Sequence, residues 1–252
     1  MPSIHEADDL YQSAAPFVVI YGEPGVGKTS LALEFPDPFF LSLENGLPKG
    51  TTVKGFGPDK LPDLHAVFDT LRSLYEEQHE FKTVVIDTAS VLQNYILKEV
   101  KARAGGKALE NISYGKGYVM LSEITGEVIN WLTAINDTGI SIVILAHSDV
   151  KRYDDPETVS YDKLKLKLDK RIESIINETS HCILCVKRDI KVREDDEESK
   201  FNNRVHAEGG QTRWIHTDGR AAFTAKNRYK MPPRILYEEG SGYAALSQYF
   251  YS

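Results

Sequence analysis

Residues 22–29 read GEPGVGKT, which is a complete phosphate-binding pattern, G-x-x-x-x-G-K-[ST]. The apolar run FVVIY at residues 17–21 precedes it and the stretch SLALEF at residues 30–35 follows it, so we expect a strand, a loop and a helix in that order. Glycines allow successive backbone N–H groups to turn toward an anion, and the positive end of the following helix strengthens the attraction. The stretch therefore predicts a phosphate-binding loop in an α/β fold.

Residue types within this loop indicate a nucleotide with its metal ion. Lys28 is placed to reach the terminal phosphates, and the Thr29 hydroxyl is placed to complete the shell of a Mg²⁺ ion. We therefore expect ATP and Mg²⁺ as ligands. The expected nucleotide-binding residues are Gly22, Glu23, Pro24, Gly25, Val26, Gly27, Lys28, Thr29 and Ser30.

A second metal ligand is expected at the end of the apolar segment TVVID, residues 83–87, which reads as a buried parallel strand. Asp87 is the candidate, together with Thr29. Thr88 follows Asp87, so a hydrolytic base directly after the metal-binding acid is absent. The base must come from another strand.

Two further strand ends supply candidates for catalysis. The segment FFLSLE ends in Glu44, and SIVILA at residues 141–146 is followed by His147. The carboxyl ends of parallel strands share one edge of a sheet, where ligands bind, so Glu44 is expected to polarise the attacking water. An ordinary turn acid remains the alternative for Glu44. A neutral His147 is expected to hydrogen-bond the terminal phosphate or the water and to report hydrolysis to the following loop.

Apolar residues at helical spacing in residues 64–75 and 121–135 alternate with these strands, which predicts a mostly parallel sheet flanked by helices. From His181 onward the pattern is β-rich. The segment KLKLKL, residues 163–168, alternates with a period of two, whereas Leu164, Leu168, Ile172 and Ile175 also fit a helix, and both readings stay open. One domain of 252 residues is expected, with an extension at 1–15, a core at about 16–236 and a tail at 237–252.

Composition limits the class of protein. The hydrophobic fraction of 41% suits one substantial core, and no apolar run is long enough to span a membrane. Residues 1–15 lack the basic and apolar regions of a signal peptide, so a cytoplasmic location is expected. The only cysteines, Cys182 and Cys185, lie three apart in a β-segment, so their side chains are expected on opposite faces, buried and reduced.

Five segments together resemble a known family. In chain order they are GEPGVGKT, LSLENG, VVIDT, VILAHSDVKRYDDP and AFTAKNRYKMP. They look like the phage-encoded nucleotide-binding proteins of the RecA and DnaB type that act as single-strand annealing recombinases. The similarity spans roughly residues 16–236.

This resemblance implies a RecA-like ATPase core that assembles head to tail, as a ring or a filament, on single-stranded DNA and promotes annealing and recombination. A single-stranded DNA-binding protein is a further possible partner, and a phage protein would work in the host cytoplasm. Lys226 and Arg228 match the family's K-x-R pair, which reaches into the neighbouring subunit's nucleotide. A cation delivered in this way stabilises charge on the transferred phosphoryl group. A solvent-facing basic turn is the alternative.

DNA binding has to be local, because the net charge of the chain is −7. In RecA-like proteins, two loops face DNA. One follows the helix after the Asp87 strand, the other follows the His147 strand, and both are basic here. Interleaved tyrosines are suited to stacking on bases. The expected DNA-binding residues are Lys101, Arg103, Lys107, Lys116, Lys151, Arg152, Lys163 and Lys165.

Two other functions use the same loop. One is a motor subunit of a helicase or packaging kind, and the other is a small-molecule kinase. The kinase needs an acceptor pocket and a closing lid, for which the sequence gives no signal. A GTPase is disfavoured because no D-x-x-G follows Asp87 and no N-K-x-D occurs.

Overall fold

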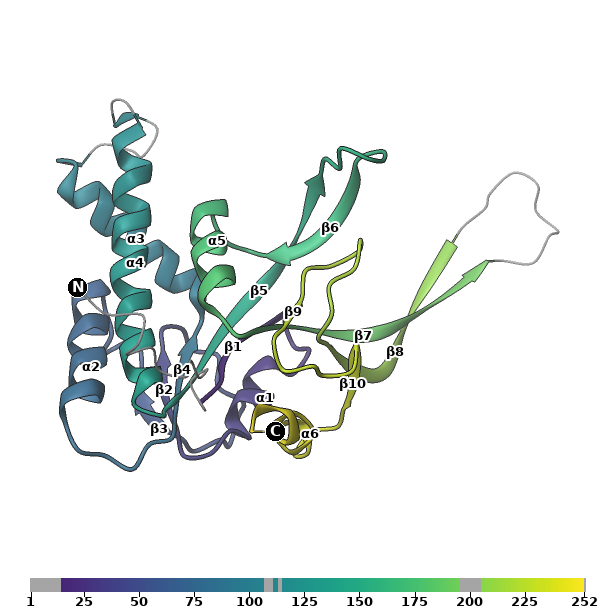
Figure 1. The fold of residues 1–252 in the computed structure, drawn as a ribbon, viewed down its shortest axis with the longest axis horizontal. Coiled ribbons are helices and arrows are strands. Elements are labelled where there is room, and N and C mark those ends of the chain that lie inside the picture. The colour runs from purple at the N-terminus through teal and green to yellow at the C-terminus, as the bar shows by residue number, and fades with distance from the viewer. Residues whose placement is uncertain (1–14, 107–110, 113–114, 195–204, 252) are drawn as a thin grey trace, which may run out of the picture.

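A ten-stranded mixed sheet forms the centre of the computed structural model, which describes residues 15–106, 111–112, 115–194 and 205–251 (Figure 1). The strand order is β10-β8-β7-β1-β5-β4-β2-β3, with β6 paired to β5 and β9 paired to β7. The strands are β1 (Phe17–Gly22), β2 (Pro38–Ser42), β3 (Lys54–Phe56), β4 (Thr83–Asp87), β5 (Ser141–Tyr153), β6 (Tyr161–Leu166), β7 (Cys182–Glu194), β8 (Val205–His216), β9 (Lys226–Asn227) and β10 (Arg234–Tyr237). The helices are α1 (Lys28–Leu33), α2 (Leu64–Glu76), α3 (Ala89–Arg103), α4 (Lys116–Asp137), α5 (Lys170–Thr179) and α6 (Gly242–Phe250).

The six strands from β7 to β3 in this order run parallel, whereas β8 and β10 are antiparallel additions at one side. The register places Gly22 beside both His147 and Val186, and Asp87 beside Ser42. All of these residues lie at the carboxyl ends of the parallel strands. We call this edge of the sheet the nucleotide edge.

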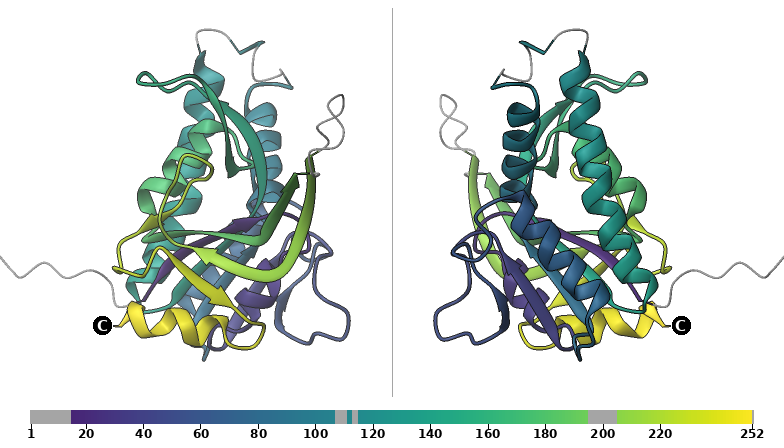
Figure 2. Two further views of the ribbon diagram at one scale, coloured as in Figure 1. Left: turned by 90° about the vertical axis from the view of Figure 1, so that its right-hand side faces the viewer. Right: turned by 90° about the vertical axis from the view of Figure 1, so that its left-hand side faces the viewer.

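Helices cover both faces of the sheet (Figures 1 and 2). Buried residues of α2, α3, α4 and α5 join one core cluster, and α1 and α6 contribute to the other. Cys185 belongs to the first cluster and Cys182 to the second, and both are buried and free. The predicted placement of the two thiols on opposite faces is therefore confirmed.

The ambiguous stretch after His147 forms a hairpin followed by a helix. β5 continues past His147 to Tyr153 and pairs with β6, so the strand period of KLKLKL prevails. The helix begins only after Asp169, whose side chain caps it by accepting a hydrogen bond of 2.9 Å from the Arg171 N–H. We refer to residues 148–166 as the β5–β6 arm, which projects from the sheet in Figure 1.

Residues 237–250 pack against the sheet, although a tail was expected from residue 237 onward. Tyr237 ends β10, and Leu246 and Phe250 of α6 are buried against the same face as α1. Apolar residues at helical spacing in GYAALSQYF account for this packing. None of the helices in the described part of the chain has the length and apolar character needed to cross a membrane.

Candidate nucleotide site and basic arm

The phosphate-binding loop is held in shape by close backbone contacts. A Cβ atom at Gly22 would lie only 2.3 Å from the Val186 carbonyl oxygen, so only glycine fits between β1 and β7. Gly27 has a φ of 105° and precedes the first turn of α1. The Val26 side chain is buried in the core and anchors the loop. The loop therefore presents its N–H groups and the start of α1 at the nucleotide edge.

Lys28 is folded onto its own loop. Its buried ammonium donates to the carbonyl oxygens of Gly22 at 3.0 Å and Glu23 at 2.9 Å. Burial lowers the pKa of Lys28, and the nearby Asp87 and Glu44 carboxylates act in the opposite direction. The ammonium is thus next to the phosphate-binding loop and can exchange its carbonyl partners for phosphate oxygens.

Thr29 and Asp87 lie together as the sequence predicted. The Thr29 hydroxyl donates to Asp87 Oδ2 at 3.3 Å, and Asp87 is only 2% exposed. Burial first, and then the Glu44 carboxylate, raise the pKa of Asp87 to about 6. A hydroxyl and a carboxylate with excess negative charge around it fit the oxygen ligands that Mg²⁺ prefers, with water and phosphate oxygens to complete the shell. These two residues are therefore suited to hold the metal.

Glu44 and His147 also meet at this edge. Their closest atoms, Glu44 Oε1 and His147 Nε2, are 3.4 Å apart. The Leu43 N–H donates to the Asp87 carbonyl at 2.6 Å, which fixes the Glu44 segment next to β4. The other ring nitrogen of His147 is buried without a hydrogen-bond partner among the described residues. The structure thus brings Glu44 to the nucleotide edge, with an imidazole beside it that can orient the carboxylate.

Arg213 and Tyr237 are loop neighbours that the sequence did not reveal. The Tyr237 hydroxyl donates to the Gly27 carbonyl at 3.2 Å, and the Arg213 guanidinium lies 4.7 Å from the Tyr237 ring centroid. They reach the loop only because β8 pairs with β7 and β10 pairs with β8. No local sequence pattern signals such a placement.

Lys226 and Arg228 lie at the opposite edge of the sheet. β9 pairs with Cys182 and Ile183 at the amino end of β7, whereas the phosphate-binding loop adjoins the carboxyl end of its parallel segment. The Lys226 ammonium donates to the carbonyl oxygens of Asn177, Glu178 and Ser180 at the end of α5. Arg228 is exposed, and its guanidinium donates to the Glu178 carbonyl at 3.4 Å. Neither cation is placed to contact the nucleotide of its own chain.

The predicted DNA-binding residues fall into two groups. Lys101, Arg103 and Lys116 are exposed where α3 ends and α4 begins, and Lys107 lies outside the described residues. In the arm, Lys163 and Lys165 place their ammonium groups 5.3 and 5.2 Å from the Tyr153 ring centroid. Tyr153 also pairs with Tyr161, their ring centroids being 5.4 Å apart. This face of the arm combines cations with aromatic rings.

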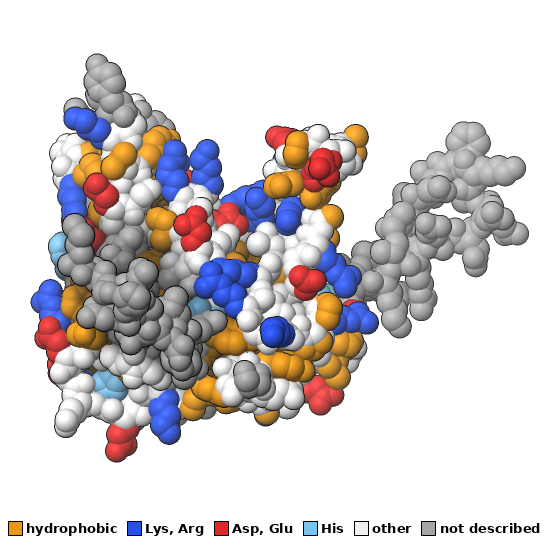
Figure 3. All heavy atoms as spheres, viewed as in Figure 1, with side chains coloured by type: hydrophobic (Ala, Val, Ile, Leu, Met, Phe, Trp, Pro, Cys, Tyr) orange, Lys and Arg blue, Asp and Glu red, His pale blue; other side chains and the backbone are white. Residues whose placement is uncertain are grey.

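Two arm cations are engaged within the chain. Lys151 donates to the carbonyl oxygens of Leu166 at 3.0 Å and Leu168 at 2.8 Å, and its ammonium lies 3.6 Å from the Glu173 carboxylate. Arg152 is exposed and lies 3.6 Å from Asp162 across the hairpin. Lys151 therefore joins the base of the arm to α5. Figure 3 shows Lys and Arg side chains gathered in the hollow between the arm and α5.

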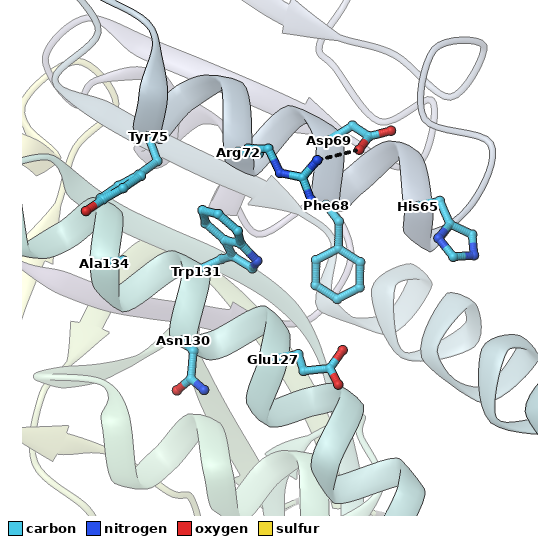
Figure 4. Close-up of a pocket in the computed structure, with 9 residues that line it drawn as sticks. All are labelled: His65, Phe68, Asp69, Arg72, Tyr75, Glu127, Asn130, Trp131 and Ala134. Carbon is cyan, nitrogen blue, oxygen red and sulfur yellow. Dashed lines mark ion pairs between the residues drawn. The ribbon is translucent and has the colours of Figure 1, made fainter.

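The described residues also form hollows in the surface. A groove of about 670 Å³ between α2 and α4 is lined by Phe68, Tyr75 and Trp131, with Arg72 and Asp69 paired at 3.8 Å on its rim (Figure 4). It contains none of the predicted site residues. A smaller cavity of about 300 Å³ adjoins Glu44 and is lined by Ser42, Asn45 and Gly57 among others. Unlike the groove, this smaller cavity lies beside the nucleotide edge.

A mostly parallel sheet with Lys28, Thr29, Asp87 and Glu44 at its carboxyl edge has the architecture of a P-loop ATPase. The chain belongs to the AAA domain family AAA_24, whose family model matches residues 14–229.

Solved structures similar to the chain include two archaeal proteins. The flagellar accessory protein FlaH from Methanocaldococcus jannaschii is 10% identical, with a TM-score of 0.41, and the match covers 88% of this chain and 84% of FlaH. A KaiC-like protein from Pyrococcus horikoshii OT3 is 13% identical, with a TM-score of 0.42, covering 88% of this chain and 90% of that protein. No curated protein matches the sequence.

Proposed function

We propose that this ATPase assembles head to tail on single-stranded DNA, as a ring or a filament, and promotes annealing and homologous recombination. The observation that carries the proposal is the course of β5. This strand places His147 beside Glu44 at the nucleotide edge and then continues, without interruption, into the basic and aromatic arm. A phage-encoded protein of this kind would work in the host cytoplasm, with a single-stranded DNA-binding protein as a further partner.

The arm has the chemistry that single strands require. Lys163, Lys165, Tyr153 and Tyr161 share one face of the hairpin, because alternate residues of paired strands point the same way. Cations follow the phosphate backbone, and aromatic rings stack on bases without regard to sequence. Binding by this face tolerates any sequence, as annealing requires.

Hydrolysis is assigned to the residues of the nucleotide edge. Glu44 accepts a proton from a water molecule as the water oxygen bonds to the terminal phosphorus, the bond from phosphorus to the bridging oxygen breaks, and ADP leaves. Lys28 turns from the Gly22 and Glu23 carbonyls to the phosphates and offsets their developing charge. When bound, Mg²⁺ neutralises charge on the phosphate oxygens.

Lys226 and Arg228 are proposed to act on the neighbouring subunit's nucleotide. Their position at the amino edge of the sheet, away from their own loop, supports delivery between subunits. Arg228 is the more available of the two, because Lys226 already donates to three carbonyl oxygens. Hydrolysis then depends on assembly.

The decisive experiment compares ATP hydrolysis with and without single-stranded DNA and follows annealing of two complementary labelled strands. The proposal predicts a strong rate increase with the single strand, together with annealing. An unchanged rate and no annealing would refute it. Unwinding of duplex DNA without annealing would instead identify a motor subunit.

Subunit mixing tests the role of Arg228. An Arg228→Ala protein keeps its phosphate-binding loop, and a Lys28→Ala protein keeps Arg228, so an interface that joins the two intact halves should regain activity. The mixture is compared with each variant alone, after subunit exchange and assembly of both variants have been verified. No recovery in mixed oligomers would place Arg228 in a structural role.

One observation favours a second candidate function. The cavity of about 300 Å³ beside Glu44 could admit a small acceptor molecule, as phosphoryl transfer to a metabolite would require. Screening small hydroxyl-bearing acceptors with labelled ATP distinguishes this function. A phosphorylated acceptor formed without DNA would replace the recombinase proposal with a kinase.

A further inference from the structure

We propose that Arg213 binds the nucleotide of its own subunit, at the phosphate nearest the nucleoside. The proposal rests on the nucleotide site described above and does not depend on DNA binding. Arg213 lies on β8, far along the chain from the phosphate-binding loop, and it is neither part of the Lys226 and Arg228 pair nor one of the expected DNA-binding residues.

The contact between Arg213 and the loop is close. A Cβ atom at Gly27 would lie 2.6 Å from Arg213 Nη1 and 3.1 Å from Tyr237 Cε1. Gly27 is the last residue of the phosphate-binding loop before α1. The guanidinium therefore stands within reach of a phosphate chain lying along Gly27 and the first turn of α1.

The strand order determines which end of the nucleotide Arg213 meets. Asp87 and Glu44 flank the loop from the side of β5, β4 and β2, where they define the metal and terminal-phosphate end. Arg213 approaches from the other side of β1, beyond β7. A phosphate chain with its terminal phosphate near Asp87 therefore has its nucleoside end toward Arg213.

The surroundings hold the guanidinium in position but leave it available. Its carbon lies 4.7 Å from the Tyr237 ring centroid, and Nη2 donates to Glu239 Oε2 at 3.1 Å. The Arg213 side chain is 19% exposed, whereas Glu239 is 63% exposed. Nη1 of the guanidinium lies beside Gly27. It can therefore donate to a phosphate oxygen while Nη2 keeps its carboxylate partner.

Affinity measurements with Arg213→Met test the proposal, because methionine keeps an apolar stem over Tyr237 and removes the charge. Equilibrium binding of ATP and of ADP should weaken by the same factor, roughly tenfold or more, the size expected of a charge-assisted hydrogen bond. The factors should match because both nucleotides carry the phosphate nearest the nucleoside. Arg213→Lys, a milder change, should weaken both by a smaller and again equal factor.

The matched control is Arg234→Met. Arg234 stacks on Trp214, with its guanidinium carbon 4.4 Å from the ring centroid, but it lies on the opposite face of the same antiparallel strands. This variant should bind both nucleotides as the parent chain does. Unchanged ADP affinity in a folded Arg213→Met protein would overturn the proposal, and so would a loss confined to ATP. If Arg213→Met does not fold, unchanged ADP affinity in Arg213→Lys overturns it equally.

Discussion

The nucleotide edge and the β5–β6 arm are both rich in charged residues, yet their charges are arranged differently. At the nucleotide edge, the Glu44 carboxylate is close enough to raise the pKa of Asp87, and Asp87 is nearly inaccessible to solvent. In the arm, Lys151 and Arg152 have acidic partners, and only some of the lysines face a ring. Uncompensated buried charge costs stability and therefore indicates a ligand, whereas compensated surface charge is also found without one.

Lys28→Ala should have the largest effect. Without the ammonium, the loop loses its charged contact with the terminal phosphates, and ATP hydrolysis should fall by roughly a thousandfold. Steady-state phosphate release measures this. Lys82→Ala, which removes an exposed partner of Asp37, is the control and should retain the parent rate. Equal rates in both variants would remove Lys28 from the catalytic site.

Glu44→Gln should slow hydrolysis by about a hundredfold and leave ATP binding intact, since the amide cannot accept the proton of the attacking water. Single-turnover hydrolysis and equilibrium ATP binding separate the two effects. The 3.4 Å contact with His147 Nε2 can persist as a hydrogen bond to the amide oxygen, which makes the substitution structurally mild. A full rate would reassign Glu44 to the turn that follows β2.

Charge removal in the arm should have an intermediate effect on DNA binding. Replacing both Lys163 and Lys165 with Gln should lower the slope of log affinity against log salt by about 1.4, or about 0.7 for each lost phosphate contact with a single strand. Titrations of an oligonucleotide at several salt concentrations measure the slope.

Lys151→Met is the contrast for this measurement. The Lys151 ammonium is bound to two carbonyl oxygens and lies near Glu173. Its loss should therefore lower the melting temperature and leave the slope of log affinity against log salt nearly unchanged. A large change of slope in Lys151→Met, with none in the double variant, would reverse the assignment within the arm.

Asp87→Asn should have a small effect on thermal stability, in the direction of a higher melting temperature when nucleotide and metal are absent. A raised pKa of about 6 means that the folded chain binds this proton more tightly than the unfolded chain does. The associated stability is present below about pH 4 and is lost as the pH rises through about 6. At pH 7.5, without nucleotide and metal, Asp87→Asn should therefore melt a few degrees higher than the parent, and the difference should shrink toward pH 4.

The same titration affects turnover in the parent protein. Protonated Asp87 is a poor metal ligand, so the Mg²⁺ concentration needed for half-maximal hydrolysis should rise as the pH falls through about 6. Thermal melts across pH 4 to 8 test the predicted stability, and rate measurements over the same range test the predicted turnover. A lower melting temperature for Asp87→Asn at pH 7.5 would show that the carboxylate stabilises the fold.

The nucleotide edge was predictable because the ligand dictates both residue types and their order along the chain. Gly22, Lys28, Thr29 and Asp87 follow from a local motif and one buried strand, and parallel strands necessarily bring Glu44 and His147 to the same edge. The roles of Glu44 and His147 remain predictions. Their proximity is confirmed.

The remaining features depend on contacts between distant segments. Gly27 and Tyr237 are 210 residues apart, and the pairing of β7, β8 and β10 that joins them has no signature in either segment. The basic side chain of Lys226 likewise gives no indication that three carbonyl oxygens at the end of α5 surround its ammonium. In KLKLKL, two periodicities fitted the same residues, and pairing with β5 decided between them.

The continuity of β5 also restricts which insertions and deletions the chain can tolerate. His147, Asp149, Lys151 and Tyr153 share one face of a single strand, because side chains alternate at every residue. Adding or removing one residue between His147 and Tyr153 would turn the Tyr153 ring and its paired lysines to the other face, while Glu44 still met His147. Adding or removing two residues would keep that face. The number of residues between the nucleotide edge and the arm can therefore change only in steps of two, and homologous chains should differ there by even numbers of residues.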